Sequence, residues 1–393
     1  MLKLITLLLT STMTVMAGAT IAPALPQIQA FFQEQPDADF WVKLMLTIPG
    51  LFTAIGGLFI GTIIDRFGSK KILAVAIVIY GLAGGTGCYL SSLTGLLIGR
   101  AFLGLTVAAI TTASVALIAS YYQDAKRNQV MGIQASFMGF GGVAFLTLGG
   151  ILADLNWRGP FFIYLSAFVI FPLVIFYLDE PKNSKSVTSD NNLNPQQVEK
   201  LPLTTIALIY GLMFVTMVAF YMIPTQIPFY LTETFAVNNS QTGIAIASAT
   251  LTSALVSMGY GLIRKYLSFT TILVILYLFF GTGYLIIGAV NNYSLVIVGI
   301  ILSGGGMGLL LPNMNVWINA ITPATSRGKV LGGLTTCMFL GQFSSPIITD
   351  PIADRVGLGS SYGVIGWGLL SLAILLTFFL VVKANKRKKV AKN

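Results

Sequence analysis

Hydrophobic residues form long stretches of this chain, and short clusters of charged or polar residues separate them. Because about 20 apolar residues in a helix cross the hydrocarbon core of a bilayer, each stretch predicts a membrane-spanning helix. The pattern therefore predicts an all-α membrane protein with 12 transmembrane helices, at residues 4–25, 41–64, 72–92, 94–121, 130–152, 159–178, 203–231, 241–263, 270–290, 293–319, 330–350 and 361–382.

A long-range repeat divides these helices into two sets. Residues 127–154 align without a gap on residues 327–354, so that Ala153-Asp154 matches Ala353-Asp354. Duplicated sets of spanning helices are typical of secondary transporters. We expect two pseudo-symmetric six-helix bundles at 1–178 and 203–382, a cytoplasmic linker at 179–202 and a basic cytoplasmic tail at 383–393.

The first span also has features of a cleavable secretory signal, because Lys3 precedes an apolar run that ends near Ala17-Gly18-Ala19. Cleavage would leave eleven spans and break the repeat, so a retained helix accounts better for the chain. Cys88 and Cys337 fall inside predicted spans, where they are expected to pack as small apolar residues. We therefore expect no disulfide framework, metal cluster or cofactor.

Positive charge collects on alternate loops. If the amino terminus is cytoplasmic, most Lys and Arg residues fall on inner loops, and the outer loops keep only Lys43, Arg158 and Arg355. This asymmetry predicts that both termini face the cytoplasm of a bacterial plasma membrane. The net charge of +10 then reflects topology and contact with anionic membrane lipid, and no nucleic-acid partner is expected.

The loops leave no room for a soluble catalytic domain. The widest polar interval, residues 179–200, is rich in Ser, Asn, Gln and Pro and reads as a flexible linker. With 55% hydrophobic and only 9% charged residues, the chain also carries too few charges to coat a soluble surface of its size. We therefore expect a transporter and not an enzyme.

A glycine-rich and charged motif lies between the second and third spans. Small residues let helices approach closely, and Asp65 can cap a helix end while neighbouring cations hold the loop at the membrane surface. A short basic loop that only fixes topology accounts for the same residues. The motif consists of Gly61, Asp65, Arg66, Gly68, Lys70 and Lys71.

This motif resembles the signature of the major facilitator superfamily, whose members have two six-helix halves. The run Gly99-Arg100-Ala101-Phe102-Leu103-Gly104 is similar to the fourth-helix pattern of that family, and the resemblance covers the whole chain. In the family, the loop motif acts as a latch that closes the cytoplasmic side. By resemblance, Asp65, Arg66 and Asp124 serve the latch here, while the second half lacks the matching acid.

Arg100 lies several residues inside the fourth span, where a cation is costly unless it is paired, solvated or facing a cavity. Its family counterpart is associated with proton transfer or cavity electrostatics. The alternative is a structural Arg bonded to helix carbonyls. The remaining candidates for coupling are Glu233 and Asp350, near the outer ends of their spans, although helix capping or interfacial hydration is the better explanation for each.

The fifth span departs from the pattern of drug:proton antiporters. Its glycines survive, but Phe145-Leu146 stands where those proteins have Gly-Pro. Close packing is expected without the proline kink.

Polar and aromatic residues within apolar spans are candidates for a substrate cavity, since the resemblance implies that helices one, four, seven and ten line a central path. Helix packing is an equally good explanation for any one of them. The candidates are Thr14, Met16, Thr111, Gln134, Phe137, Tyr221, Gln226, Asn313, Asn315 and Gln342.

We accordingly expect a monomeric secondary active transporter that moves a small amphiphilic solute by alternating access, with proton-coupled efflux by antiport as the leading interpretation. Two alternatives stay open: uptake or facilitated diffusion of a neutral metabolite such as a sugar, and a non-transporting membrane sensor or lipid-binding protein.

Overall fold

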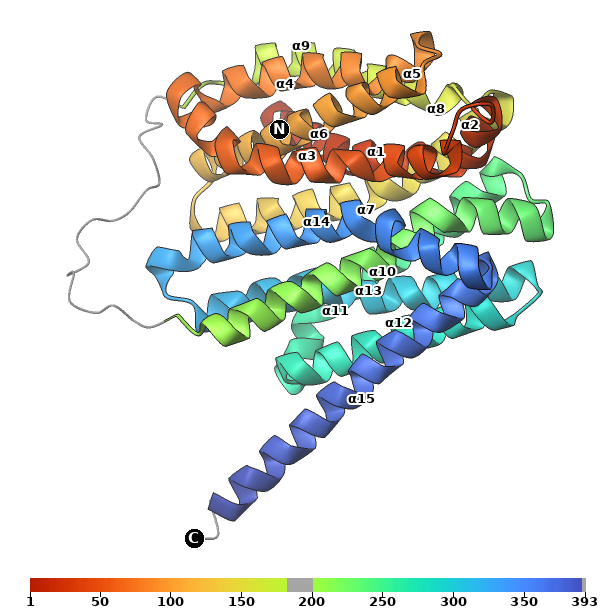
Figure 1. Cartoon of the computed structure of the whole chain (residues 1–393). Coiled ribbons are helices and arrows are strands. Elements are labelled where there is room, and N and C mark those ends of the chain that lie inside the picture. The colour runs from red at the N-terminus through yellow and green to blue at the C-terminus, as the bar shows by residue number, and fades with distance from the viewer. Residues whose placement is uncertain (182–200, 391–393) are drawn as a thin grey trace.

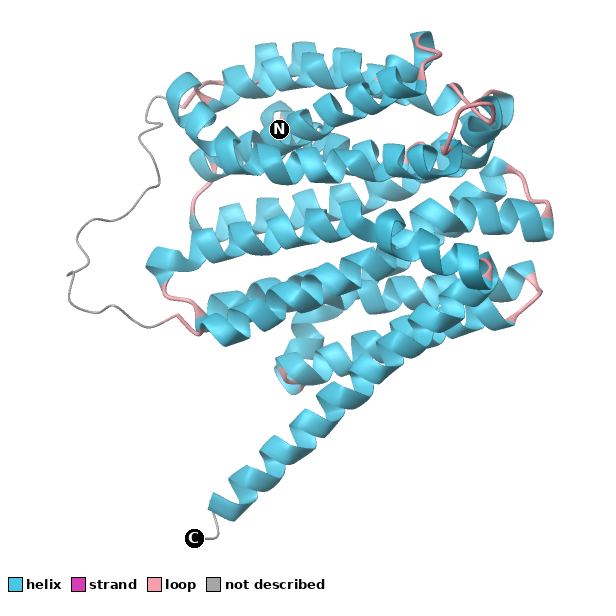
Figure 2. Cartoon of the chain, in the orientation of Figure 1, coloured by secondary structure: helices cyan, strands magenta, loops and turns pink. Residues whose placement is uncertain are grey.

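The computed structural model describes residues 1–181 and 201–390, except for the side chains of residues 124, 125, 128, 324 and 383–390. The described chain is almost entirely helical, and these ranges contain no β-strand (Figure 2). The all-α prediction is therefore confirmed. Most of the predicted linker, the side chains of the basic tail and that of Asp124 lie outside the described residues.

The N-terminal half, residues 1–181, holds the first set of membrane-length segments. Three of these segments are interrupted by short turns or 3₁₀ helices. Its elements are α1 (Leu2–Ala19), η1 (Ala22–Ala24), α2 (Leu25–Phe31), α3 (Ala38–Phe67), α4 (Ser69–Gly84), α5 (Thr86–Tyr89), α6 (Leu93–Tyr121), α7 (Asp124–Leu155), α8 (Gly159–Phe162), η2 (Ile163–Ser166) and α9 (Ala167–Tyr177).

The C-terminal half, from residue 201, consists of long uninterrupted helices. They are α10 (Leu203–Phe235), α11 (Asn239–Tyr266), α12 (Phe269–Ala289), α13 (Tyr293–Ile321), α14 (Ala324–Val356) and α15 (Leu358–Val390). The repeat seen in the sequence falls on α7 and α14, which begin at residues 124 and 324 and occupy the fifth position of their halves. The helix α15 continues through most of the stretch predicted as a tail.

Eleven helical segments of the described ranges are long and apolar enough to cross a membrane. The helix α14 is not among them, because Thr, Ser, Gln, Asp and Arg side chains interrupt its apolar surface. It packs against α10 on one side and α3 on the other, so protein shields much of its polar surface from lipid. The chain is thus a multi-pass membrane protein in which α14, less apolar than the other long helices, is shielded from lipid by its neighbours.

Short polar caps and glycines set the turns between helices. Asn238 and Gln241 form a reciprocal capping box at the start of α11, and the Ser268 hydroxyl accepts a bond from a backbone N–H of α12. Gly68, with φ of 95°, lets the chain reverse between α3 and α4. Such caps satisfy backbone groups that a helix end leaves unpaired.

The helices run side by side, and two helix pairs make the most extensive contacts between the halves (Figure 1). These pairs are α7 with α11 and α3 with α14. We call the end of the array near Tyr177 and Leu203 the linker end and the opposite end the far end. Figure 1 shows the linker end on the left, with α15 running away from the array toward the C-terminus.

Candidate functional site between the two halves

Backbone contact joins the halves at the far end of α7 and α11. A β-carbon on Gly150 would lie 2.5 Å from the carbonyl oxygen of Asn239, and one on Gly243 would lie 2.6 Å from that of Leu146. Real β-carbons do not approach backbone so closely. Glycine at these positions therefore lets the two helices cross in direct contact.

A carboxylate completes this contact. Asp154, at the end of α7, accepts hydrogen bonds from the backbone N–H groups of Asn239 at 2.8 Å and Ser240 at 3.1 Å. The Ser240 hydroxyl also donates to it. These groups form the first turn of α11, where the helix dipole favours a negative charge. One half thus caps a helix of the other.

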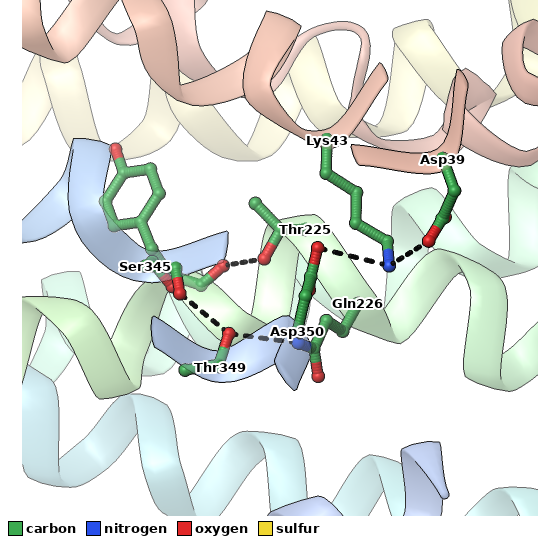
Figure 3. A network of polar contacts seen from close by, with 8 residues as sticks. Asp39, Lys43, Thr225, Gln226, Ser345, Thr349 and Asp350 are labelled. Atoms are coloured by element: carbon green, nitrogen blue, oxygen red, sulfur yellow. Dashed lines mark hydrogen bonds and ion pairs between the residues drawn. The ribbon is translucent and has the colours of Figure 1, made fainter. Parts of the chain in front are cut away.

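An ion pair joins α3 and α14 at the same end. Lys43 Nζ lies 3.4 Å from Asp350 Oδ2 and 3.1 Å from Asp39 Oδ2 (Figure 3). The amide of Gln226 on α10 donates to Asp350 Oδ1 at 2.8 Å and to the Thr349 hydroxyl at 3.0 Å. Lys43 also lies over the ring of Phe229, 5.3 Å from its centroid. The network is deeply buried, with Lys43 only 4% and Asp350 only 5% exposed.

Four helices meet closer to the middle of the array. A β-carbon on Gly18 would stand 3.6 Å from the Tyr221 hydroxyl and 3.7 Å from Gln342 Nε2, and Gln342 also packs on Gly50. This cluster joins α1, α3, α10 and α14. Tyr221 and Gln342 of the predicted cavity set are therefore placed in one region, whereas Met16 is buried on α1.

The two halves lose contact toward the linker end. No described atom of a neighbouring segment lies within 4 Å of where a β-carbon of Gly61 on α3, Gly132 on α7, Gly261 on α11 or Gly332 on α14 would stand. The exposed fraction of Leu58 on α3 reaches 67%. The same four helices that close the far end are thus separate at the linker end.

Arg100 lies inside the N-terminal half, only 1% exposed. Its Nη1 donates to the Tyr164 hydroxyl at 2.8 Å and to the carbonyl of Ala17 at 3.3 Å, and the guanidinium lies over the rings of Phe161 and Tyr164. Among the described residues, its Nε and Nη2 have no hydrogen-bond partner. Aromatic faces and carbonyls stabilise this cation, so the described geometry agrees with the structural alternative for Arg100.

The other predicted cavity residues are scattered. Thr14 and Thr111 donate to carbonyls of their own helices. Gln134 donates to Ser11 at 2.7 Å. Asn313 accepts from Tyr260 and donates to the carbonyl of Phe269. Phe137 is 42% exposed, Asn315 is half-buried, and Glu233 is exposed at the far end.

The predicted latch residues lie at the linker end. Asp65, Arg66 and Lys71 are exposed, and among the described residues none of the three forms an ion pair. The Lys70 side chain donates to the carbonyl of Ile175. The carboxylate of Glu180 accepts from the backbone N–H groups of Lys70 and Lys71 at 3.1 and 3.3 Å, against Gly68.

A surface ion pair lies beside this loop. Lys3 donates to the carboxylate of Asp179, and this hydrogen bond, followed by the positive charge of Lys3, holds the pKa of Asp179 below its ordinary value of 3.8. Asp179 is fully exposed, so solvent screens the interaction.

The sequence did not predict the roles of three residues described above, Lys43, Asp154 and Glu180. Lys43 was expected on an outer loop, and that placement is wrong, because Lys43 lies within α3 and is buried. The i,i+4 spacing of Asp39 and Lys43 was the available signal. Asp154 stood in the repeat without an assigned role, and nothing in the sequence paired Glu180 with the start of α4.

Comparisons with known proteins identify the architecture. Residues 7–226 and 209–393 each match the model of the Major Facilitator Superfamily. The chain is 23% identical to the tetracycline resistance protein, class D, of Salmonella ordonez, over 92% of each chain. It is also 23% identical to the PmrA homologue of Lactococcus lactis, described as a multi-drug resistance efflux pump, over 94% of this chain and 92% of that protein.

A solved structure shares the fold. A bacterial homologue of the human lysosomal transporter Spinster, in an inward-facing and occupied conformation, superposes with a TM-score of 0.75, covering 96% of this chain and 95% of that one at 19% identity. The match of the family model to both halves is decisive, because it covers nearly the whole chain. This chain therefore belongs to the major facilitator superfamily of membrane transporters.

Proposed function

We propose that this secondary transporter exports a small amphiphilic solute from a bacterial cell, in exchange for protons. Support for export comes from the similarity, over nearly the full length, to resistance proteins, one of which is described as an efflux pump. Alternating access of two helical sets is the mechanism that such a repeat supports.

The observation that carries this proposal is the unequal contact between the halves. They touch through Gly150, Gly243 and the Lys43–Asp350 ion pair at the far end, and they are apart at Gly61 and Gly332 at the linker end. This is the geometry of one state in an alternating-access cycle, closed on one side and open on the other. The Tyr221–Gln342 region stands between the two ends.

We assign the linker end to the cytoplasm. The cations Arg66, Lys70 and Lys71 lie there, so the positive-inside rule supports this orientation. In this orientation the conformation is inward-open. Each of the two proposed bundles, residues 1–178 and 203–382, crosses the membrane six times, so both termini lie on the cytoplasmic side. We propose that the protein acts as a monomer.

In the inward-open state the latch is expected to be released, and among the described side chains, which do not include that of Asp124, Asp65 and Arg66 form no ion pair. When the inner side closes, Asp65 and Arg66 would approach the start of α14, and we propose Asp124, at the start of α7, as the second acid of the latch. Arg100, Glu233 and Asp350 remain the coupling candidates, and Asp350 has the strongest support, because it is buried beside a cation at the boundary between halves.

The test is solute flux from purified protein in liposomes, with a panel of drugs and metabolites and with or without an imposed pH gradient. Gradient-driven export of amphiphilic solutes is the expected result. Flux that ignores the gradient would indicate facilitated diffusion, and uptake of a neutral metabolite would reverse the direction. No flux for any solute would favour the sensor or lipid-binding alternative.

Arg100→Lys is the matched variant, because it keeps the buried charge while shortening the reach to Tyr164 and Ala17. If Arg100 serves coupling, the gradient dependence changes in this variant. If Arg100 is structural, the variant lowers thermal stability, and the gradient dependence of its remaining flux is unchanged.

A further inference from the structure

Lys43 and Asp350 form the ion pair that crosses between the two halves in the described parts of the chain, residues 1–181 and 201–390. Both are almost fully buried, at 4% and 5% exposure. Removing one member of a buried pair leaves a charge without compensation, which is strongly destabilising. A transporter that must separate its halves on this side therefore needs a way to break the pair at low cost.

Each ion has a second partner within its own half. Lys43 is 3.1 Å from Asp39, one turn earlier on the same helix, and Asp39 is 48% exposed at the far end. Asp350 accepts a 2.8 Å hydrogen bond from Gln226 on α10, which also packs along α14. When α3 and α14 separate, each ion can keep the partner that moves with it.

We propose that Lys43 and Asp350 form a reversible outer gate, and that Asp39 and Gln226 hold the two ions when the gate opens. The pair stabilises the inward-open state, whereas Asp39 and Gln226 lower the cost of the outward-open state. This inference rests on the alternating access and orientation proposed above, and it does not depend on the solute or on the coupling ion.

The gate predicts opposite effects for the two acids that contact Lys43. Asp350→Asn removes a partner available only in the closed gate. It should therefore raise the ratio of outward-open to inward-open molecules, the outward-to-inward ratio, about fivefold or more. Asp39→Asn removes the partner that remains when the gate opens, so it should lower the same ratio. Asp354→Asn is the control, since Asp354 is exposed four residues further along α14 and forms no ion pair among the described residues.

The ratio can be measured by pulsed electron spin resonance on the full chain in lipid nanodiscs. One pair of spin labels reports the outer side and a second pair reports the inner side, and all four positions are exposed. The native cysteines Cys88 and Cys337 are first replaced by Ala. The label positions are Gln33 with Thr234 for the outer side and Thr62 with Thr335 for the inner side.

A double-mutant cycle separates the pair from its two members. Lys43→Met and Asp350→Asn should each shift the ratio, and the double variant should shift it by much less than the product of the two factors, since the interaction is lost only once. Lys43→Arg keeps the charge and should restore a ratio near that of the parent protein. A simple loss of stability would not produce this rescue or the opposite sign of Asp39→Asn.

The gate is overturned if Asp350→Asn behaves like Asp354→Asn, or if Asp39→Asn and Asp350→Asn shift the ratio in the same direction. Should Asp350→Asn fail to fold, Asp39→Asn still decides the matter, because Asp39 is half-exposed and its loss leaves the buried pair in place. Flux measured in parallel keeps the two proposals apart. Proton-driven export without these shifts would refute the gate alone, and the shifts without any flux would refute the transport proposal alone.

Discussion

The two helix pairs that join the halves close the outer side by different means. The α7–α11 pair depends on direct backbone contact at Gly150 and Gly243, and on a carboxylate that caps a helix. The α3–α14 pair depends on long side chains, Lys43 and Asp350, that meet across the boundary. Backbone contact admits no additional atom, whereas an ion pair can exchange partners as the helices move apart.

This difference assigns the pairs different roles in our proposal. At the glycine crossing the backbones of α7 and α11 touch directly, so this contact is lost as soon as the helices move apart. The ion pair adds an adjustable preference for the closed state, because Asp39 and Gln226 offset part of the cost of breaking it. The two pairs occupy related positions in the repeat, yet the sequence has specialised them in opposite ways.

The largest effect is expected from Gly150→Val. Its side chain would overlap the carbonyl of Asn239, so the outer side could not close and solute flux should fall at least about tenfold. Gly368→Val is the control, since no described segment lies within 4 Å of its added β-carbon and its helix, α15, belongs to neither pair that joins the halves. Flux in liposomes and the outer label distance measure the result. Equal flux from both variants would contradict a steric crossing at Gly150.

Asp154→Ala should also weaken closure of the outer side, but by less than Gly150→Val. It removes the bonds to Asn239 and Ser240 and the charge at the start of α11, a loss of about 1 kcal/mol, or about fivefold in the outward-to-inward ratio. Asp154→Asn should lose less of this stabilisation than Asp154→Ala, because its side-chain oxygen still accepts one hydrogen bond. Label distances read the ratio, and an unchanged ratio in Asp154→Ala would show that the cap does not stabilise closure.

Asp65→Asn should act at the inner side and should favour the inward-open state, opposite to the two variants above. The latch stabilises the state whose inner side is closed, so its loss should favour the inward-open state by about twofold to threefold. The inner label pair measures this shift. Glu34→Gln, an exposed acid on the outer loop, serves as the control. A shift of Asp65→Asn toward the outward-open state would exclude a latch at this position.

The smallest effect concerns Asp179, whose pKa is held below 3.8 by the hydrogen bond from Lys3. A lowered pKa means that this contribution to stability is present above pH 3.8 and is lost as the pH falls through the lower folded-state pKa. Asp179→Asn should therefore lower the unfolding temperature by no more than about 1 °C at pH 6, and the difference should vanish at acid pH. Thermal unfolding at several pH values checks it.

Much of the helical framework was predictable because its causes are local. An apolar stretch of spanning length must form a helix in lipid, since each backbone group has to find its partner within the segment. The repeat between residues 127–154 and 327–354 likewise predicted matching helices, now seen as α7 and α14. The first span extends further than expected, because η1 and α2 continue it to Phe31.

The candidate site was less predictable because its contacts are not local. Gln342 and Tyr221 were singled out as polar residues in apolar spans and Asp350 as an acid near the end of a span, and each lies at or near the boundary between halves. Arg100 was singled out by the same reasoning, yet its described contacts lie within the N-terminal half. Burial of a charge shows that a partner is needed, and it does not show which helix supplies that partner.

The sequence by itself determined the helices, the repeat and the positive charge of alternate loops, since these follow from hydropathy and from the order of residues along the chain. Only the tertiary structure decided which end is closed, that Gly150 meets Asn239, and that Lys43 meets Asp350. These contacts depend on how helices far apart in the chain are placed in space, and a glycine or a lysine carries no record of its distant neighbour.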